Sequence, residues 1–156
     1  AWARRVHLQG VNENLEQALE HFPESFGHIS MLYVRCEVNG VPLMAMVDTG
    51  AQATMMSEVC ARRLGVMHLV DDRFRGTAKG VGNKSIIGKV HILPMKLGNS
   101  YISVSIMVLE GDTLGPDLLF GLDNLLRHQC CLDMARRVLR LGPGSEEEVP
   151  FVANPD

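Results

Sequence analysis

The stretch MLYVRCEVNGVPLMAMVDTGA, residues 31–51, decides the fold expected for this chain. Two apolar runs with β-branched residues, 31–38 and 41–47, are separated by Asn39-Gly40, a dipeptide that accepts the positive φ angles of a two-residue type I′ turn. This pattern predicts a β-hairpin. Shorter strand-like runs follow at 77–81, 85–96, 101–109, 117–120, 131–134 and 138–141. The sequence therefore predicts a mainly β fold, a small barrel or sandwich.

Helical periodicity is confined to three segments. An amphipathic helix is expected over 11–22, where apolar residues repeat at helical spacing from Leu15 onward. Ser57 can cap a short helix over 58–64, and a last helix fits 122–128. These elements divide the chain into an N-terminal helical extension at 1–28, a β domain at 29–141, and a flexible acidic linker or tail at 142–156 that is rich in Gly, Pro and Glu.

The composition excludes several classes of protein. The chain has 156 residues, of which 46% are hydrophobic and 21% charged, and its formal net charge is −3. A domain of this length buries a core without a disulfide or metal. The acidic balance and the lack of a long basic run argue against a nucleic-acid partner. No apolar run reaches the roughly 20 residues of a membrane span, so a cytosolic or nuclear location is expected.

The cysteines predict reduced thiols. Cys36, Cys60, Cys130 and Cys131 include no pair at the C-x-x-C spacing of a zinc knuckle or redox motif. The cluster from His128 to Cys131 contains soft ligands and is a conceivable metal half-site, but the sequence offers no second half-site. We therefore expect no metal.

The tripeptide Asp48-Thr49-Gly50 stands directly after the apolar run 43–47. A carboxylate at the end of a buried strand is costly unless it is used or paired. Gly50 permits a sharp turn, and the Thr49 hydroxyl can tie that turn to a neighbouring backbone. The tripeptide taken alone is more typical of an ordinary turn, because Asp and Gly are common turn residues. Its context distinguishes the two interpretations.

Two further segments supply that context. Gly80-Val81-Gly82 lies between two strand-like runs and predicts a pliant hairpin tip that suits a lid over an extended peptide. Leu118-Leu119-Phe120-Gly121 is an apolar run that ends in glycine just before a predicted helix. Such a strand can pass beside the Asp48 loop, with the glycine permitting close approach of the backbones.

The three segments, in this order, resemble the retroviral-type aspartic proteases, whose fold is a closed β-barrel with a flap hairpin and one short C-terminal helix. Residues 12–141, with VDTGAQAT, AKGVG and RHQC among their motifs, resemble the protease-like domain of the DNA-damage-inducible (Ddi) ubiquitin-shuttle proteins. Many members of that family carry Ser at the position of Thr49, which keeps the hydroxyl. The resemblance does not extend to the family's ubiquitin-binding domains.

The resemblance implies a homodimeric aspartic endopeptidase that cleaves extended polypeptides. Aspartic proteolysis needs two carboxylates that share a proton, and this chain has one Asp-Thr-Gly, so two copies would each supply Asp48. No metal or cofactor is needed, because the carboxylate pair activates the water. The remaining site residues would be Thr49 and Gly50 beside Asp48, and Ala51, Gln52, Gly80, Val81, Gly82 and Leu119 around the substrate.

The resemblance also implies partners. The substrate would be a polypeptide, including ubiquitin-conjugated ones, and the link to ubiquitin and the proteasome would run through flanking domains. The alternative is a non-catalytic dimeric module that binds peptide or acts as a scaffold, in a ubiquitin-shuttle protein or in a nuclear-receptor-interacting protein of similar fold. An intact Asp48-Thr49-Gly50 favours the enzyme, because a binding module has no need to maintain facing carboxylates.

Overall fold

The computed structural model describes residues 1–78, 83–112 and 115–153, and the chain forms two compact units, Ala1–Ser30 and Met31–Asp156. The first unit contains the helix α1 (Trp2–His21) and the 3-10 turn η1 (Pro23–Phe26). Helix α1 begins earlier than the predicted segment 11–22. Apolar periodicity marks only its second half, whereas the Ala, Arg, Leu and Gln residues of its first half favour helix by intrinsic propensity.

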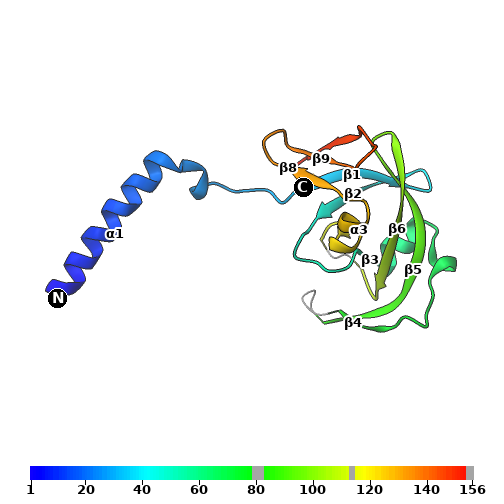
Figure 1. Cartoon of the computed structure of the whole chain (residues 1–156). Helices are drawn as coiled ribbons and strands as arrows, with labels where there is room; N and C mark the ends of the chain where they lie inside the picture. The colour runs from blue at the N-terminus through cyan, green and yellow to red at the C-terminus, as the bar shows by residue number, and fades with distance from the viewer. Residues whose placement is uncertain (79–82, 113–114, 154–156) are drawn as a thin grey trace. The chain divides into compact units, whose positions relative to one another are not determined.

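The second unit contains a closed β-barrel (Figure 1). Its sheet has the order β1-β2-β7-β3-β6-β5-β4, and the additional pairing of Cys36 in β1 with Leu97 in β5 closes six of these strands into a ring. The strands are β1 (Tyr33–Val38), β2 (Val41–Val47), β3 (Met55–Ser57), β4 (Gly76–Ala78), β5 (Lys84–Leu97), β6 (Ser100–Leu109) and β7 (Leu118–Phe120). The expected mainly β barrel is confirmed.

The β1–β2 hairpin forms as the sequence predicts. Asn39 and Gly40 have φ angles of 50° and 74°, as a type I′ turn requires, and Val38 pairs with Val41 across it. The Nδ2 of Asn39 also donates to the Leu64 carbonyl at 2.9 Å. The register of the hairpin therefore directs alternate residues of β1 into the core. It also fixes the position of Val47, the last residue of β2, relative to β1.

Short helices cover the barrel. Helix α2 (Glu58–Arg63) is capped by Ser57, whose Oγ accepts from the Cys60 N–H at 3.0 Å, and the 3-10 turn η2 (Met67–Leu69) follows it. Helix α3 (Leu122–Arg127) lies at the predicted place. No helix within the described ranges has both the length and the apolar character that crossing a membrane requires.

The C-terminal segment differs from the expected flexible linker. A second sheet has the order β10-β9-β8, with β8 (Cys131–Asp133), β9 (Val138–Arg140) and β10 (Glu148–Pro150). Val149 is buried in the core, and the Val152 N–H donates to the Tyr33 carbonyl at 2.8 Å. The acidic, Gly- and Pro-rich composition hides a short alternation of apolar residues in this segment. The alternation is enough to form a strand, because β9 and β1 already offer it backbone partners.

Candidate active site

Asp48 leaves the barrel where β2 ends. Strand β2 runs parallel to β7, with Val47 paired to Phe120, and the Asp48 N–H donates to the Phe120 carbonyl at 3.0 Å. Asp48 is half-buried, whereas Thr49 and Gly50 are exposed. The parallel pairing thus brings the Leu-Phe-Gly segment beside the carboxylate, as the sequence predicts.

The turn after β2 orients the Asp48 carboxylate. The Gly50 N–H donates to Oδ1 of Asp48 at 2.9 Å, and the Ala51 N–H donates to the Asp48 carbonyl at 3.2 Å. One carboxylate oxygen is therefore engaged by the backbone of its own turn. The Asp-Thr-Gly tripeptide supplies this geometry locally, since Asp commonly accepts from the backbone two residues ahead.

The beginning of α3 holds the middle of this loop. The first N–H groups of a helix have no partner inside it, and here those of Leu122 and Asp123 donate to the carbonyls of Ala51 and Gln52, at 2.8 and 3.1 Å. Gly121 makes the approach possible, because a Cβ there would lie 2.7 Å from the Ala53 carbonyl carbon. We call residues 48–54 the floor loop.

The floor loop borders a cleft of about 500 Å³. The lining includes the expected Asp48, Gly50, Ala51, Gln52 and Leu119, whereas Thr49 is not part of it. Gly80, Val81 and Gly82 lie outside the described residues. Sequence reasoning missed the other lining residues, which are Ala53, Met55, Thr77, Ala78, Ile86 and Met107. Thr77, Ala78, Ile86 and Met107 lie in predicted strands, but the strand pattern does not indicate which face meets the cleft. Ala53 and Met55 lie in no predicted element.

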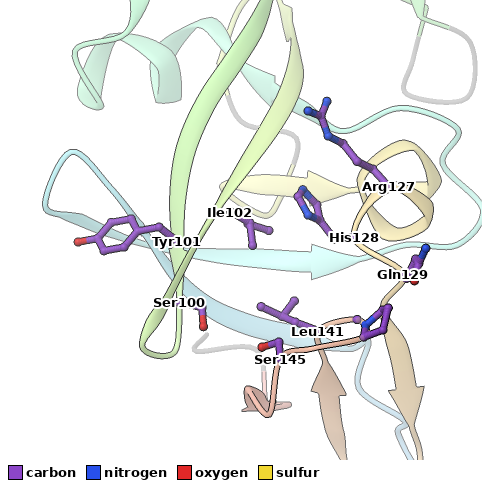
Figure 2. A pocket seen from close by; sticks show the side chains of 10 residues that line it. Ser100, Tyr101, Ile102, Arg127, His128, Gln129, Leu141 and Ser145 are labelled. Carbon is purple, nitrogen blue, oxygen red and sulfur yellow. The ribbon is translucent and has the colours of Figure 1, made fainter.

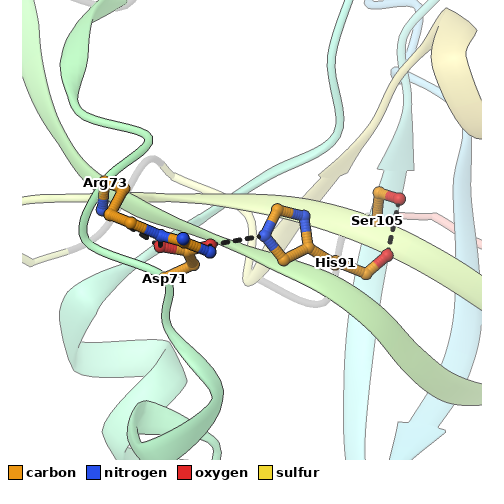
Figure 3. Close-up of polar contacts among 4 residues, drawn as sticks. All are labelled: Asp71, Arg73, His91 and Ser105. Carbon is orange, nitrogen blue, oxygen red and sulfur yellow. Dashed lines mark hydrogen bonds and ion pairs between the residues drawn. The ribbon is translucent and has the colours of Figure 1, made fainter.

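Residues 66–75, which we call the strap, lead into β4 and so toward the cleft. Asp71 pairs with Lys89 of β5 through two backbone hydrogen bonds of 2.9 and 3.2 Å. The Asp71 carboxylate accepts from the Arg73 side chain at 2.8 and 2.9 Å and lies 2.8 Å from Nε2 of His91 (Figure 3). Arg73, and secondarily His91, hold the pKa of Asp71 well below its usual range.

A second hollow, of about 440 Å³, lies between the start of β6, the end of α3 and the segment after β9 (Figure 2). His128 stands in its wall, with Nε2 2.7 Å from the Ser103 carbonyl. Among the described residues that line it there is no carboxylate, whereas the cleft at the floor loop contains Asp48. We therefore place the candidate active site at the cleft.

The cysteines and histidines of the described residues form no metal-binding group of three or more ligands. His128 is engaged with Ser103, while Cys131 Sγ accepts from Arg140 at 3.2 Å. Burial raises the pKa of Cys36 to about 12 and that of Cys130 to about 11. All four cysteines are free thiols, and these two resist ionisation at neutral pH.

Comparison with known proteins agrees with this geometry. A sequence profile of the aspartyl protease family matches residues 23–133. The chain is 46% identical over 151 residues to Protein DNA-DAMAGE INDUCIBLE 1 of Arabidopsis thaliana, covering 97% of this chain and 36% of that protein. It is 47% identical over 137 residues to Protein DDI1 homolog 1 of Homo sapiens, covering 88% and 34%. The chain thus spans about a third of the length of these relatives.

The barrel matches a solved structure. The crystal structure of the retroviral protease-like domain of Ddi1 from Leishmania major superposes with a TM-score of 0.73 and 40% sequence identity, covering 83% of this chain and 99% of that one. The retropepsin-like fold is thereby confirmed. This chain belongs to the aspartyl protease family, as a member of the Ddi group with its retroviral protease-like domain.

Proposed function

We propose that this domain is an aspartic endopeptidase that acts as a homodimer, with Asp48 of each copy forming one catalytic pair. The observation that carries the proposal is the placement of Asp48 at the cleft, on a loop held by backbone hydrogen bonds from β7 and α3. Peptide hydrolysis by this chemistry needs one carboxylate to activate water and a protonated one to polarise the scissile carbonyl. One chain supplies half of that pair.

The remaining site residues take roles around Asp48 in this proposal. Thr49 bonds across the two-fold axis and keeps the two loops coplanar, and its exposure leaves the hydroxyl accessible to a second copy. Gly50, Ala51 and Gln52 present backbone groups to the substrate along the floor. Leu119 faces substrate side chains from the wall, and Gly80, Val81 and Gly82 cover the peptide from above.

The surface around β8 supports a symmetric dimer. Strand β8 is an edge of the three-stranded sheet β10-β9-β8. Met134, which directly follows β8, has 60% of its surface exposed, and Leu126 of the preceding helix α3 has 71%. An edge strand with neighbouring apolar side chains is a template for pairing with another chain. We propose that the partner is a second copy, because a closed two-fold contact also brings the two Asp48 loops together.

The cleft favours an extended substrate with apolar side chains next to the cleaved bond. Met55, Ile86, Met107 and Leu119 all line it. Strand β4 is the edge of the seven-stranded sheet and contributes Thr77 and Ala78 to the same lining. A peptide that adds to such an edge gains main-chain hydrogen bonds, and the pockets between alternate side chains select its sequence.

The cellular role in this proposal follows the Ddi relatives. We propose that the full-length protein uses this domain in protein turnover by the ubiquitin–proteasome pathway, in the cytosol or nucleus. Its substrates would include ubiquitin-conjugated polypeptides, delivered through domains beyond the third of the relatives that this chain spans.

The test is cleavage of a long unfolded polypeptide, free and ubiquitin-conjugated, from pH 4 to 8 by the parent and by Asp48→Asn. We expect the parent to cleave with an optimum on the acidic side, where two facing carboxylates share one proton. Asp48→Asn should be inactive yet still dimeric and folded. Equal cleavage by both proteins would assign the activity to a contaminant, and binding without cleavage by the parent would favour the peptide-binding module.

A further inference from the structure

The exit of the floor loop is held by a buried polar cluster that the catalytic proposal does not use. Thr54, the last residue of the loop, and Asn124 of α3 are 0% and 1% exposed. The Thr54 hydroxyl donates to Oδ1 of Asp123 at 2.7 Å. It accepts from the Gly121 N–H at 3.1 Å and from Nδ2 of Asn124 at 2.6 Å.

These contacts use the full capacity of a hydroxyl group, which has one proton to donate and two lone pairs to accept. Of the twenty side chains, Ser alone repeats this donor and acceptor set on an equally short stem. The Thr54 N–H donates to the same Asp123 oxygen at 3.0 Å. Removing the hydroxyl would therefore leave polar groups of Gly121, Asp123 and Asn124 with fewer partners in a buried place.

Asn124 connects this cluster to the barrel wall. Its Nδ2 donates to the Ser105 carbonyl at 2.9 Å, and its Oδ1 accepts from the Ser105 N–H at 3.2 Å. Two residues along β6, the Met107 N–H donates to the Thr54 carbonyl at 2.9 Å. Since residues two apart in a strand direct their backbone groups to the same side, the Asn124 amide continues the β3–β6 ladder where the floor loop has left the sheet.

From this geometry we infer that Thr54 and Asn124 are positioning residues for Asp48, and the inference rests on the proposed function. The floor loop enters at the Asp48–Phe120 hydrogen bond and leaves at Thr54, so its two ends are fixed to β7 and α3. Strand β7 and helix α3 are joined directly by Gly121. The Thr54 hydroxyl thus closes a ring of contacts that fixes the loop carrying the carboxylate.

The experiment compares Thr54→Val, which keeps the side-chain shape and loses the hydroxyl, with Thr54→Ser, which keeps the hydroxyl. Misplacing a reacting group by about 1 Å costs on the order of 100-fold in rate. For Thr54→Val we expect kcat to fall about 10- to 100-fold per folded dimer, with KM changed less than about 3-fold. Thr54→Ser should restore kcat to within about 3-fold of the parent.

Amide hydrogen exchange gives a readout that does not depend on catalysis. In Thr54→Val the N–H groups of Asp48, Gly50 and Ala51 should exchange faster, while those of the β1–β2 hairpin should not change. If the parent cleaves nothing, the proposed function fails. Faster amide exchange in the floor loop of Thr54→Val, restored to the parent rate in Thr54→Ser, would still show that the hydroxyl positions the loop.

A kcat per folded dimer that is unchanged in Thr54→Val would overturn the inference, since the hydroxyl would then serve stability alone. Failure of a folded Thr54→Ser protein to recover kcat would overturn it as well. If Thr54→Val does not fold, Asn124→Asp replaces it, because that side chain matches Asn in shape but lacks the Nδ2 donors. The same loss of kcat and the same local exchange are then required.

Discussion

The floor loop and the strap both position walls of the same cleft, yet they are held by different forces. The floor loop is fixed by hydrogen bonds to the backbone of β7 and α3, one of which its own buried Thr54 hydroxyl accepts from Gly121. The strap packs its first part on the core, where Val66 is buried and Val70 lies against the core cluster. Beyond that it is held by two backbone hydrogen bonds and an ion-pair cluster, in which the side chains of Arg73, His91 and Asp71 are 81%, 47% and 13% exposed. Exposed charges are screened by salt, whereas buried neutral hydrogen bonds are not.

The difference assigns separate tasks to the two regions. A carboxylate that must meet its counterpart across a dimer axis needs a rigid support. In the proposed function the strap leads to the segment that covers the substrate, and such a segment has to move when an extended polypeptide enters. We therefore expect substitutions in the floor loop to reduce kcat, and substitutions in the strap to change stability in a salt- and pH-dependent way.

The largest effect is expected from Gly121→Ala, which breaks the floor. Its Cβ would meet the backbone of Ala53 at 2.7 Å, and backbone atoms cannot turn aside as a side chain can. Overpacking of this kind costs about 3 kcal/mol, and we expect the remaining folded protein to lose more than 100-fold in kcat, because the floor loop is displaced. Urea unfolding and peptide cleavage measure the two effects. Wild-type stability in this variant would show that the close approach is not required.

A smaller effect is expected from Gly88→Ala, which separates the strap from β5. The added Cβ would lie 2.4 Å from the Val70 side chain and 2.7 Å from the Asp71 carbonyl oxygen. We expect a loss of about 1–2 kcal/mol in the free energy of unfolding, with kcat reduced less than in Gly121→Ala. Gly76→Ala is the matched control, since its Cβ meets only the tip of Ile86 at 3.8 Å. Equal stability losses in both variants would refute a specific contact at Gly88.

The smallest effect is expected from Asp71→Asn, which removes the charge of the strap cluster. Because Arg73 and His91 hold the pKa of Asp71 below its usual range, the carboxylate stabilises the folded state above the ordinary Asp pKa of about 3.9. That stabilisation is lost as the pH falls toward the pKa in the folded state. Urea unfolding should therefore separate parent from variant at pH 7 in low salt, and less so in strong salt or well below pH 4.

Asp72→Asn is the control for this charge change. Asp72 is an exposed neighbour whose contact with Arg75 is longer, at 3.4 Å. We expect Asp72→Asn to cause no measurable change in the free energy of unfolding at any pH. A difference between parent and Asp71→Asn that persists undiminished in strong salt would contradict the electrostatic account of the strap.

Local signals in the sequence predict much of the fold. Asn39-Gly40 specifies the turn, and alternation of apolar residues marks the strands beside it. Strand β3 escapes prediction because it lies between the floor loop and Ser57, which the sequence marks as a helix cap, and it becomes a strand only between β6 and β7. Strand β10 escapes prediction because it lies within a segment whose composition is typical of a linker.

The candidate site also has a part that the sequence predicts and a part that it does not. Asp48 and Gly50 are predictable because their contact lies within one turn. Thr54 and Asn124 are separated by 70 positions in the sequence, so only the folded barrel brings them together. The polar pair Asp123-Asn124, two residues after Gly121, is the signal that was available, since polar side chains in the first turn of a helix commonly accept from nearby backbone.

The central claim is that one site requires Asp48 from two copies, and mixing parent with Asp48→Asn tests it most directly. At constant total protein, after subunits have exchanged, the activity should follow the square of the parent fraction, because only parent–parent pairs hold two carboxylates. An equal mixture should therefore retain about a quarter of the parent activity. An activity of about half, as for two independent sites, or of about three quarters, as for mixed dimers that are fully active, would show that a single Asp48 suffices and would contradict the account.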